Sequence, residues 1–204
     1  MKTNLRSKIK PVLLASSLAL SGLIIGIPSA LAAPATYELD TKGAHAFVQF
    51  KIKHLGYSWL LGQFNQFTGE FVYDKENIEN SSVRAEINVG SIDSNHAERD
   101  KHLRGTDFLD TDKFPKATFV STNVKKTGQN TADVTGNFTL KGITKPITLK
   151  AVQIGGGPDP WGGQRQGFEL TGQFALKDYG ITYNLGPASE VVQIYISAEG
   201  IKKK

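Results

Sequence analysis

The sequence predicts an all-β protein, an eight-stranded antiparallel barrel with one short helical insert. The first observation is that apolar and polar residues alternate with a period of two in segment after segment, which is typical of strands with one buried face. The second is that the connections between these segments are short and rich in Gly, Asn, Asp and Pro. Because closure into a barrel removes exposed strand edges, a barrel is the favoured way to arrange so many strands.

The alternation justifies each predicted strand in turn. In the clearest example, Phe168, Leu170, Phe174 and Leu176 lie on one face of a strand and polar residues lie between them. The same pattern predicts strands at 37–39, 48–54, 67–73, 83–89, 117–120, 134–140, 147–151, 168–176 and 192–198. Turn residues predict short connections at 74–77, 126–130 and 141–142, and a longer Gly/Pro-rich loop at 155–163.

One stretch, residues 94–112, has no period of two and is predicted to hold the helical insert. Ser94 can cap the start of a helix, because its hydroxyl accepts a bond from a free backbone N–H. Gly105 can end the helix, and Pro115 closes the region.

Residues 1–32 have the features of a secretory signal peptide. The first ten positions hold four basic residues and no acidic one, an apolar run covers 12–27, and 30–32 reads Ala-Leu-Ala. A membrane span needs about 20 apolar residues, and this run is shorter and interrupted by glycine. Cleavage is therefore favoured over anchoring, and residues 33–204 are predicted to form one exported, periplasmic domain.

Removal of the leader changes the charge of the protein. Four of the 24 lysines and arginines lie in the first 32 residues, which leaves 20 against 19 acidic residues. A chain so close to neutral has no basic surface to drive phosphate binding. The sequence therefore predicts no nucleic-acid partner, and no stable membrane insertion after cleavage.

No pattern of a catalytic or metal site is present. The chain has no cysteine, which excludes disulfides and thiolate chemistry, and it lacks the HExxH and GxSxG motifs. His96 and His102 lie six residues apart and do not share a helix face. His45 and His54 bracket a predicted strand, where a ring nitrogen commonly finds a backbone or carboxylate partner. The sequence predicts no catalytic residue, no metal and no cofactor.

The phenylalanines raise the question of a cavity. Eleven Phe against two Trp is a heavy apolar aromatic content, and an eight-stranded barrel has room for packed side chains or for one small ligand. The sequence leaves both arrangements open.

Residues 55–62 concentrate Tyr57, Trp59, Leu60 and Leu61 between two glycines, and are either a loop packed on the core or an apolar lid at a barrel mouth. The candidate ligand-binding residues are Phe50, His54, Trp59, Phe67, Gly69, Phe71, Phe138 and Phe168.

A set of motifs covers nearly the whole mature chain. They are Tyr37-Glu-Leu-Asp40, His45 with Phe50 and His54, Gly62-x-Phe64-x-x-Phe67-x-Gly69, Arg99-Asp100-x-His102-Leu103, Asp107-Phe108-Leu109, Phe114-Pro115, Thr135-Gly136-Asn-Phe-Thr-Leu-x-Gly142 and Asp178-Tyr-Gly180. Together they resemble the YceI-like family of exported bacterial proteins. The sequence departs from the family pattern at Ala46, where a serine is usual, and at Lys177, where an arginine is frequent.

The resemblance implies a lipocalin-like barrel that binds a polyisoprenoid or another long-chain lipid, and it implies no catalytic residue. Arg99, Asp100 and His102 are interpreted as a charged helical plug fixed against the barrel, in preference to a site for a ligand headgroup. The favoured function is a carrier or sequestering protein for a long-chain isoprenoid lipid or isoprenoid quinone.

Two other functions remain as alternatives. One is an enzyme that acts on an isoprenoid lipid through Arg99, His102 and nearby carboxylates, and the other is a stress-related structural module with a filled barrel. The sequence also leaves a homodimer open. If Gly69 faces a lipid cavity, Gly69→Leu is expected to lower lipid content without unfolding the delipidated protein.

Overall fold

The structure is a computed structural model that describes residues 33–204, so the predicted signal peptide lies outside the described residues. In chain order the strands are β1 (Ala35–Leu39), β2 (Phe47–His54), β3 (Ser58–Phe64), β4 (Phe67–Tyr73), β5 (Ser82–Asn88), β6 (Ile92–Asp93), β7 (Lys116–Lys126), β8 (Thr131–Leu140), β9 (Ile143–Pro158), β10 (Gln164–Ala175) and β11 (Val191–Lys202). The α-helix is α1 (Ala97–Arg104), and the short 3-10 helices are η1 (Ile78–Asn80), η2 (Val89–Ser91), η3 (Leu176–Tyr179) and η4 (Pro187–Ser189).

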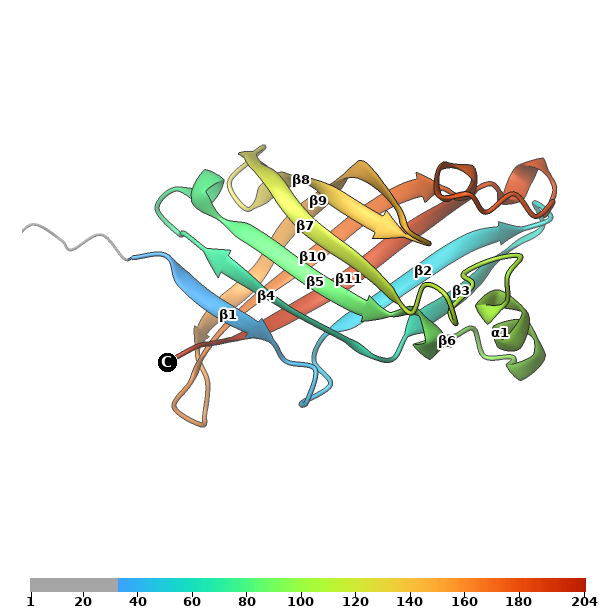
Figure 1. Ribbon diagram of the computed structural model, residues 1–204. Coiled ribbons are helices and arrows are strands. Elements are labelled where there is room, and N and C mark those ends of the chain that lie inside the picture. The colour runs from blue at the N-terminus through green and yellow to red at the C-terminus, as the bar shows by residue number, and fades with distance from the viewer. Residues whose placement is uncertain (1–32) are drawn as a thin grey trace, which may run out of the picture. The chain divides into compact units, whose positions relative to one another are not determined.

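The strands form a closed antiparallel barrel, as the sequence predicted (Figure 1). Eight of them pair in the order β1-β4-β5-β7-β8-β9-β10-β11, and β11 pairs with β1 to close the ring. The closing contact is short, because only Tyr37, Glu38 and Leu39 of β1 are in register with β11. The first half of β11 pairs with β2 instead, and β3 and the two-residue β6 continue the sheet from there.

The interior is apolar because one face of each alternating strand points inward. At the end of the barrel that holds η3, Tyr179 packs edge to face on Phe138 and Phe174, and all three ring centroids lie 5.2–5.4 Å apart. At the closing seam, Phe71 stacks on Tyr37 at 5.1 Å. Gly200 permits that stacking, since a Cβ atom there would lie 2.5 Å from the Phe71 ring.

The helical insert is present but begins later than predicted. His96 is the N-cap of α1, and its ring nitrogen accepts a bond from the Arg99 N–H at 3.2 Å. Ser94 is buried and binds Asp100 instead of capping the helix. Within residues 33–204, no helix is both long and apolar enough to span a membrane.

Two segments predicted as loops are strands. Residues 58–62 belong to β3, where Trp59 and Leu61 face solvent and Leu60 lines the interior, so that three consecutive apolar residues concealed the alternation. Residues 155–158 continue β9, and the connecting turn is confined to 159–163. Both strands contain glycine and are partly exposed, so neither shows the alternation of apolar and polar residues on which the prediction depended.

Candidate ligand-binding cavity

An apolar cavity of about 660 Å³ runs through the barrel. Its volume lies within the range of about 300–1,000 Å³ that is usual for small-molecule sites. Phe168, Leu170, Ile194 and Ile196 point into it and are only half-buried, although none of them faces the outer surface. Their accessible area faces the lumen, so this part of the barrel is hollow and Phe168 acts as lining, whereas Phe71 and Phe138 are buried against other aromatic rings.

The cavity reaches both ends of the barrel. At the end with the β4–β5 and β7–β8 connections, it is lined by exposed polar residues that include Asn77, Gln129 and Asn130. At the end with the β2–β3 hairpin and α1, the exposed residues His54 and Tyr183 line it (Figure 1). The middle is apolar, so the cavity suits a long molecule with an apolar chain.

Most of the candidate ligand-binding residues lie in this wall. Phe50, His54, Phe67, Phe71, Phe138 and Phe168 all line the cavity, whereas Trp59 and Gly69 do not. Several lining residues were not singled out from the sequence, among them Leu39, Tyr73, Leu170, Ile194, Ile196 and Tyr183. The aliphatic ones had the same inward phase as the phenylalanines, so the alternation itself was the signal that could have found them.

Trp59 lies on the outer face of the β2–β3 hairpin. It is in register with Lys53, and its ring lies 4.8 Å from the Lys51 ammonium and 5.8 Å from that of Lys53. Inward positions of the hairpin are taken by Phe50, Ile52 and Leu60. The indole therefore does not contact a molecule inside the barrel.

Gly69 faces inward, but it is covered by Leu39. A Cβ atom at Gly69 would lie 2.9 Å from Cδ1 of Leu39 and 2.8 Å from the backbone carbonyl oxygen of Arg84. Because the Arg84 backbone is held in a β ladder, it cannot move aside cheaply. The expectation that Gly69→Leu leaves the delipidated protein stable is therefore wrong, and a useful blocking substitution must start from a residue that already projects into the lumen.

The charged motif around α1, Arg99-Asp100-x-His102, divides into two roles. Asp100 is buried and accepts bonds from the backbone N–H of Ser94, at 2.8 Å, and from the Ser94 hydroxyl. Arg99 Nε donates to the same hydroxyl at 2.7 Å. This triad ties the start of α1 to the chain before it, and Asp100 is not among the residues that line the cavity.

His102 makes a different set of contacts. Its ring packs edge to face on Phe108 and Tyr183, with centroids 5.0 Å and 5.3 Å away, and its Nε2 lies 3.3 Å from Asp107. The side chains of Arg99 and His102 border the cavity as well. These two residues therefore combine a structural contact with a position at the cavity end.

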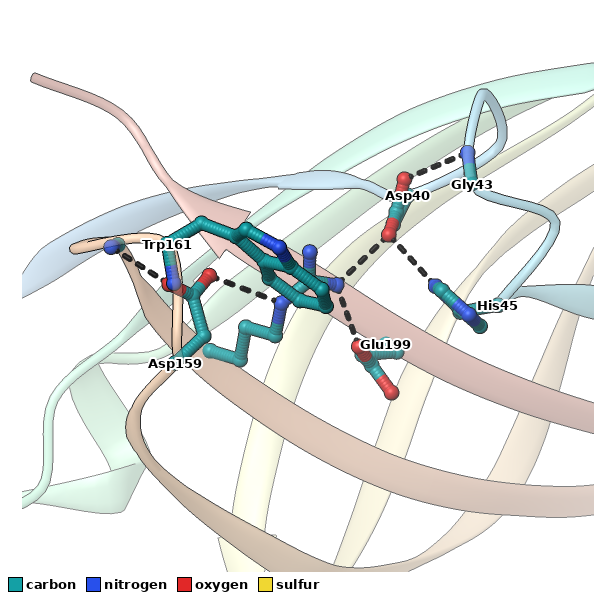
Figure 2. Close-up of polar contacts among 8 residues, drawn as sticks. Asp40, Gly43, His45, Asp159, Trp161 and Glu199 are labelled. Atoms are coloured by element: carbon teal, nitrogen blue, oxygen red, sulfur yellow. Dashed lines mark hydrogen bonds and ion pairs between the residues drawn. The ribbon is translucent and has the colours of Figure 1, made fainter.

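A partly buried ion-pair network lies near the opposite end of the barrel and was not predicted from the sequence. Figure 2 shows Asp40, Asp159 and Glu199 converging from three separate segments, with His45 beside Asp40. Arg165 on β10 joins them: its Nη1 donates to Asp40 at 2.7 Å and to Glu199, and its Nε donates to Asp159 at 3.0 Å. The Trp161 ring lies over the Arg165 guanidinium, 5.3 Å from it.

The network lowers the pKa of two of its carboxyl groups. Hydrogen bonds from His45 and Arg165 lower the pKa of Asp40 to about 2. The backbone N–H of Gly163 lowers the pKa of Asp159. His45 donates through Nδ1 to Asp40 at 2.9 Å, so its partner is a carboxylate, one of the two kinds of partner that the sequence left open.

Asp40, His45 and Glu199 also place three potential metal-ligand atoms within 4.8 Å of one another. The guanidinium of Arg165 already donates to both carboxylates, and its positive charge opposes a cation at that point. The geometry fits an ion-pair clamp better than a metal centre. Because the clamp joins β10 and β11 to the end of β1, it reinforces the short seam that closes the barrel.

Comparison with known proteins agrees with this fold. A protein named YceI from Salmonella arizonae is 54% identical over 185 residues, covering 91% of this chain and 95% of that protein. The crystal structure of BcnA from Burkholderia cenocepacia superimposes with a TM-score of 0.70 at 24% identity, covering 79% of this chain and 98% of that one.

A polyisoprenoid binding domain from Saccharophagus degradans has the same fold, with a TM-score of 0.58 at 14% identity over 84% of this chain and all of that one. The profile of the YceI-like domain matches residues 37–200, which is the described barrel almost from end to end. The chain therefore belongs to the YceI-like domain family.

Proposed function

We propose that the protein binds a long-chain apolar lipid inside the barrel, and that it carries or sequesters a polyisoprenoid or an isoprenoid quinone in the periplasm. The observation that carries this proposal is the continuous apolar cavity, whose inward Phe, Ile and Leu side chains expose their surface to the lumen. The fold shared with a polyisoprenoid binding domain supports the same ligand class.

The energetics favour a chain-like ligand. Each CH₂ group that leaves water for an apolar lumen contributes about 0.8 kcal/mol. An isoprenoid chain offers many such groups in sequence, so it can bind tightly without a specific polar contact. The polar residues at the two cavity ends are then free to contact a headgroup.

Protein purified without detergent should contain lipid. Extraction with organic solvent followed by mass spectrometry is expected to release an isoprenoid lipid in near-stoichiometric amount. Delipidated protein should take up added polyprenol or quinone, and a second extraction followed by mass spectrometry would measure the uptake. An empty extract together with failure to bind either added lipid would contradict the proposal.

Export is the second part of the proposal. The basic start, the apolar run and the Ala-Leu-Ala sequence of residues 1–32 support cleavage after Ala32. N-terminal sequencing of protein from the periplasmic fraction is expected to begin at Ala33. Intact chains that begin at Met1 and sediment with membranes would contradict cleavage.

A further inference from the structure

The β2–β3 hairpin carries an exposed patch that the binding cavity does not explain. We define the hairpin patch as Lys51, Lys53, Leu55, Tyr57, Trp59 and Leu61. Tyr57 is 87% exposed, Leu61 64%, Leu55 57% and Trp59 42%. Isolated exposed apolar residues are ordinary, but four within seven residues of one hairpin are a concentration of the kind that marks an interaction site.

The turn of the hairpin is built around an unfavourable residue. Leu55 and Gly56 form its centre with φ of 52° and 83°, and the Tyr57 N–H closes it on the His54 carbonyl at 3.0 Å. Gly, Asn and Asp are the residues that adopt such a conformation easily. A leucine held there with its side chain in solvent is a strained arrangement, which points to a role for the exposed side chain.

The same patch carries positive charge. The Lys51 and Lys53 ammonium groups lie over the Trp59 ring, and neither lysine takes part in an ion pair within residues 33–204. Glu190, an exposed acid just before β11, is not paired with either lysine. Uncompensated lysines among Trp, Tyr and Leu match the chemistry of an anionic bilayer surface, where aromatic rings lie at headgroup level and lysines meet lipid phosphates.

The patch also lies beside one end of the cavity. His54 and Leu60 of the same hairpin line the cavity, and so do Tyr183 and Leu185 of the neighbouring connection between η3 and η4. The hairpin is held firmly in place, because the Ser189 hydroxyl donates to the Lys53 carbonyl at 2.6 Å. A bilayer that contacted the patch would therefore face an end of the lumen.

We infer that the hairpin patch docks the protein on an anionic lipid bilayer and that the cavity exchanges its lipid with the membrane through this end. The lipid exchange rests on the proposed function, whereas the docking itself can be measured without a bound lipid. Docking is superficial and reversible, since the patch is a single hairpin on an otherwise intact barrel.

The test is partitioning of the cleaved, full-length domain onto vesicles. With vesicles of phosphatidylglycerol and phosphatidylcholine, the protein should co-sediment, and the Trp59 emission should shift to the blue in a Trp161→Phe background. Binding should weaken as salt rises and should be much weaker on phosphatidylcholine alone. Replacing Lys51 and Lys53 together with glutamate should lower partitioning at least about tenfold.

Matched controls separate docking from general effects. Trp161, which is 76% exposed, lies in the β9–β10 turn at the other end of the barrel, so Trp161→Ser should bind vesicles normally whereas Trp59→Ser should not (Figure 1). Lys125→Glu, on the exposed face of β7, is the charge control.

Equal vesicle binding by Trp59→Ser and Trp161→Ser would overturn the inference. So would a wild-type dimer that Trp59→Ser dissociates, because a second copy would then cover the patch. Lipid extraction of the same samples keeps the two proposals separate. Vesicle binding by a protein that contains and takes up no lipid would sustain docking and refute the carrier function, whereas bound lipid without vesicle binding would do the reverse.

Discussion

Arg165→Ala should lower the free energy of unfolding by about 3 kcal/mol at neutral pH, which is at the low end of the range for removal of one partner from a buried ion pair. The Arg165 side chain is 20% exposed and donates to three carboxylates, two of which belong to side chains only 6% exposed. Without the guanidinium, Asp40, Asp159 and Glu199 remain close together with too little positive charge among them. The closing seam of the barrel then loses its main cross-link.

Urea denaturation of the wild-type and variant domains measures this loss. Arg84→Ala is the matched control, since Arg84 is 70% exposed and its partner Glu70 also pairs with Lys203. An exposed pair of this kind contributes less than about 1 kcal/mol. Equal destabilisation by the two variants would mean that the Arg165 network does not clamp the barrel.

The same network predicts a specific pH dependence. The pKa of Asp40 is lowered from its ordinary value of 3.8 to about 2, so the stabilisation it gives is fully present above pH 3.8 and is lost as the pH falls toward 2. The loss should be about 1–2 kcal/mol, because the neighbouring His45 and Glu199 admit solvent. In Arg165→Ala, protonation of the carboxylates removes the repulsion among them and so stabilises the folded variant. The difference in the free energy of unfolding between wild type and variant should therefore narrow from pH 7 to pH 3. A gap that stays constant would contradict the electrostatic origin.

The barrel was predictable because the alternation is a local property of each strand. Where one face of a strand points inward, as for Phe168, Leu170 and Phe174, the sequence shows the period of two directly. The prediction of a strand failed at β3, because Trp59 and Leu61 are apolar and yet face solvent. In the sequence, an apolar residue that faces solvent looks the same as one that faces the interior.

The ion-pair clamp was not predictable in the same way. Asp40 and Arg165 are separated by 125 residues, and only the closure of β1 against β11 brings them together. Tyr37-Glu-Leu-Asp40 drew attention as a motif, but nothing local showed that its aspartate meets an arginine on β10. The cavity was predictable in part. The sequence identified many of the inward-facing residues, but whether they line a cavity or fill the barrel depends on the size and closure of the whole barrel.

Filling the lumen should remove the lipid without unfolding the protein. Ile196 on β11 is half-buried, lies between Leu170 and Val48 in register, and projects into the cavity. In Ile196→Trp the indole should enter space that the lipid would occupy. We expect most of the co-purified lipid to disappear while the delipidated variant unfolds within about 1 kcal/mol of the delipidated wild type, since an added ring in a hollow barrel avoids the usual overpacking cost of about 1–3 kcal/mol.

The control is Val152→Trp, which adds the same ring to an outward position of β9 that is 37% exposed. Val152→Trp should leave the lipid content unchanged. A difference between the two variants is then due to the position of the new tryptophan and not to its presence. Lipid content is measured by mass spectrometry and stability by urea denaturation after delipidation. If Ile196→Trp kept its full lipid content and lost several kcal/mol of stability, the indole would have entered packed core, and the lipid would have to lie elsewhere in the barrel.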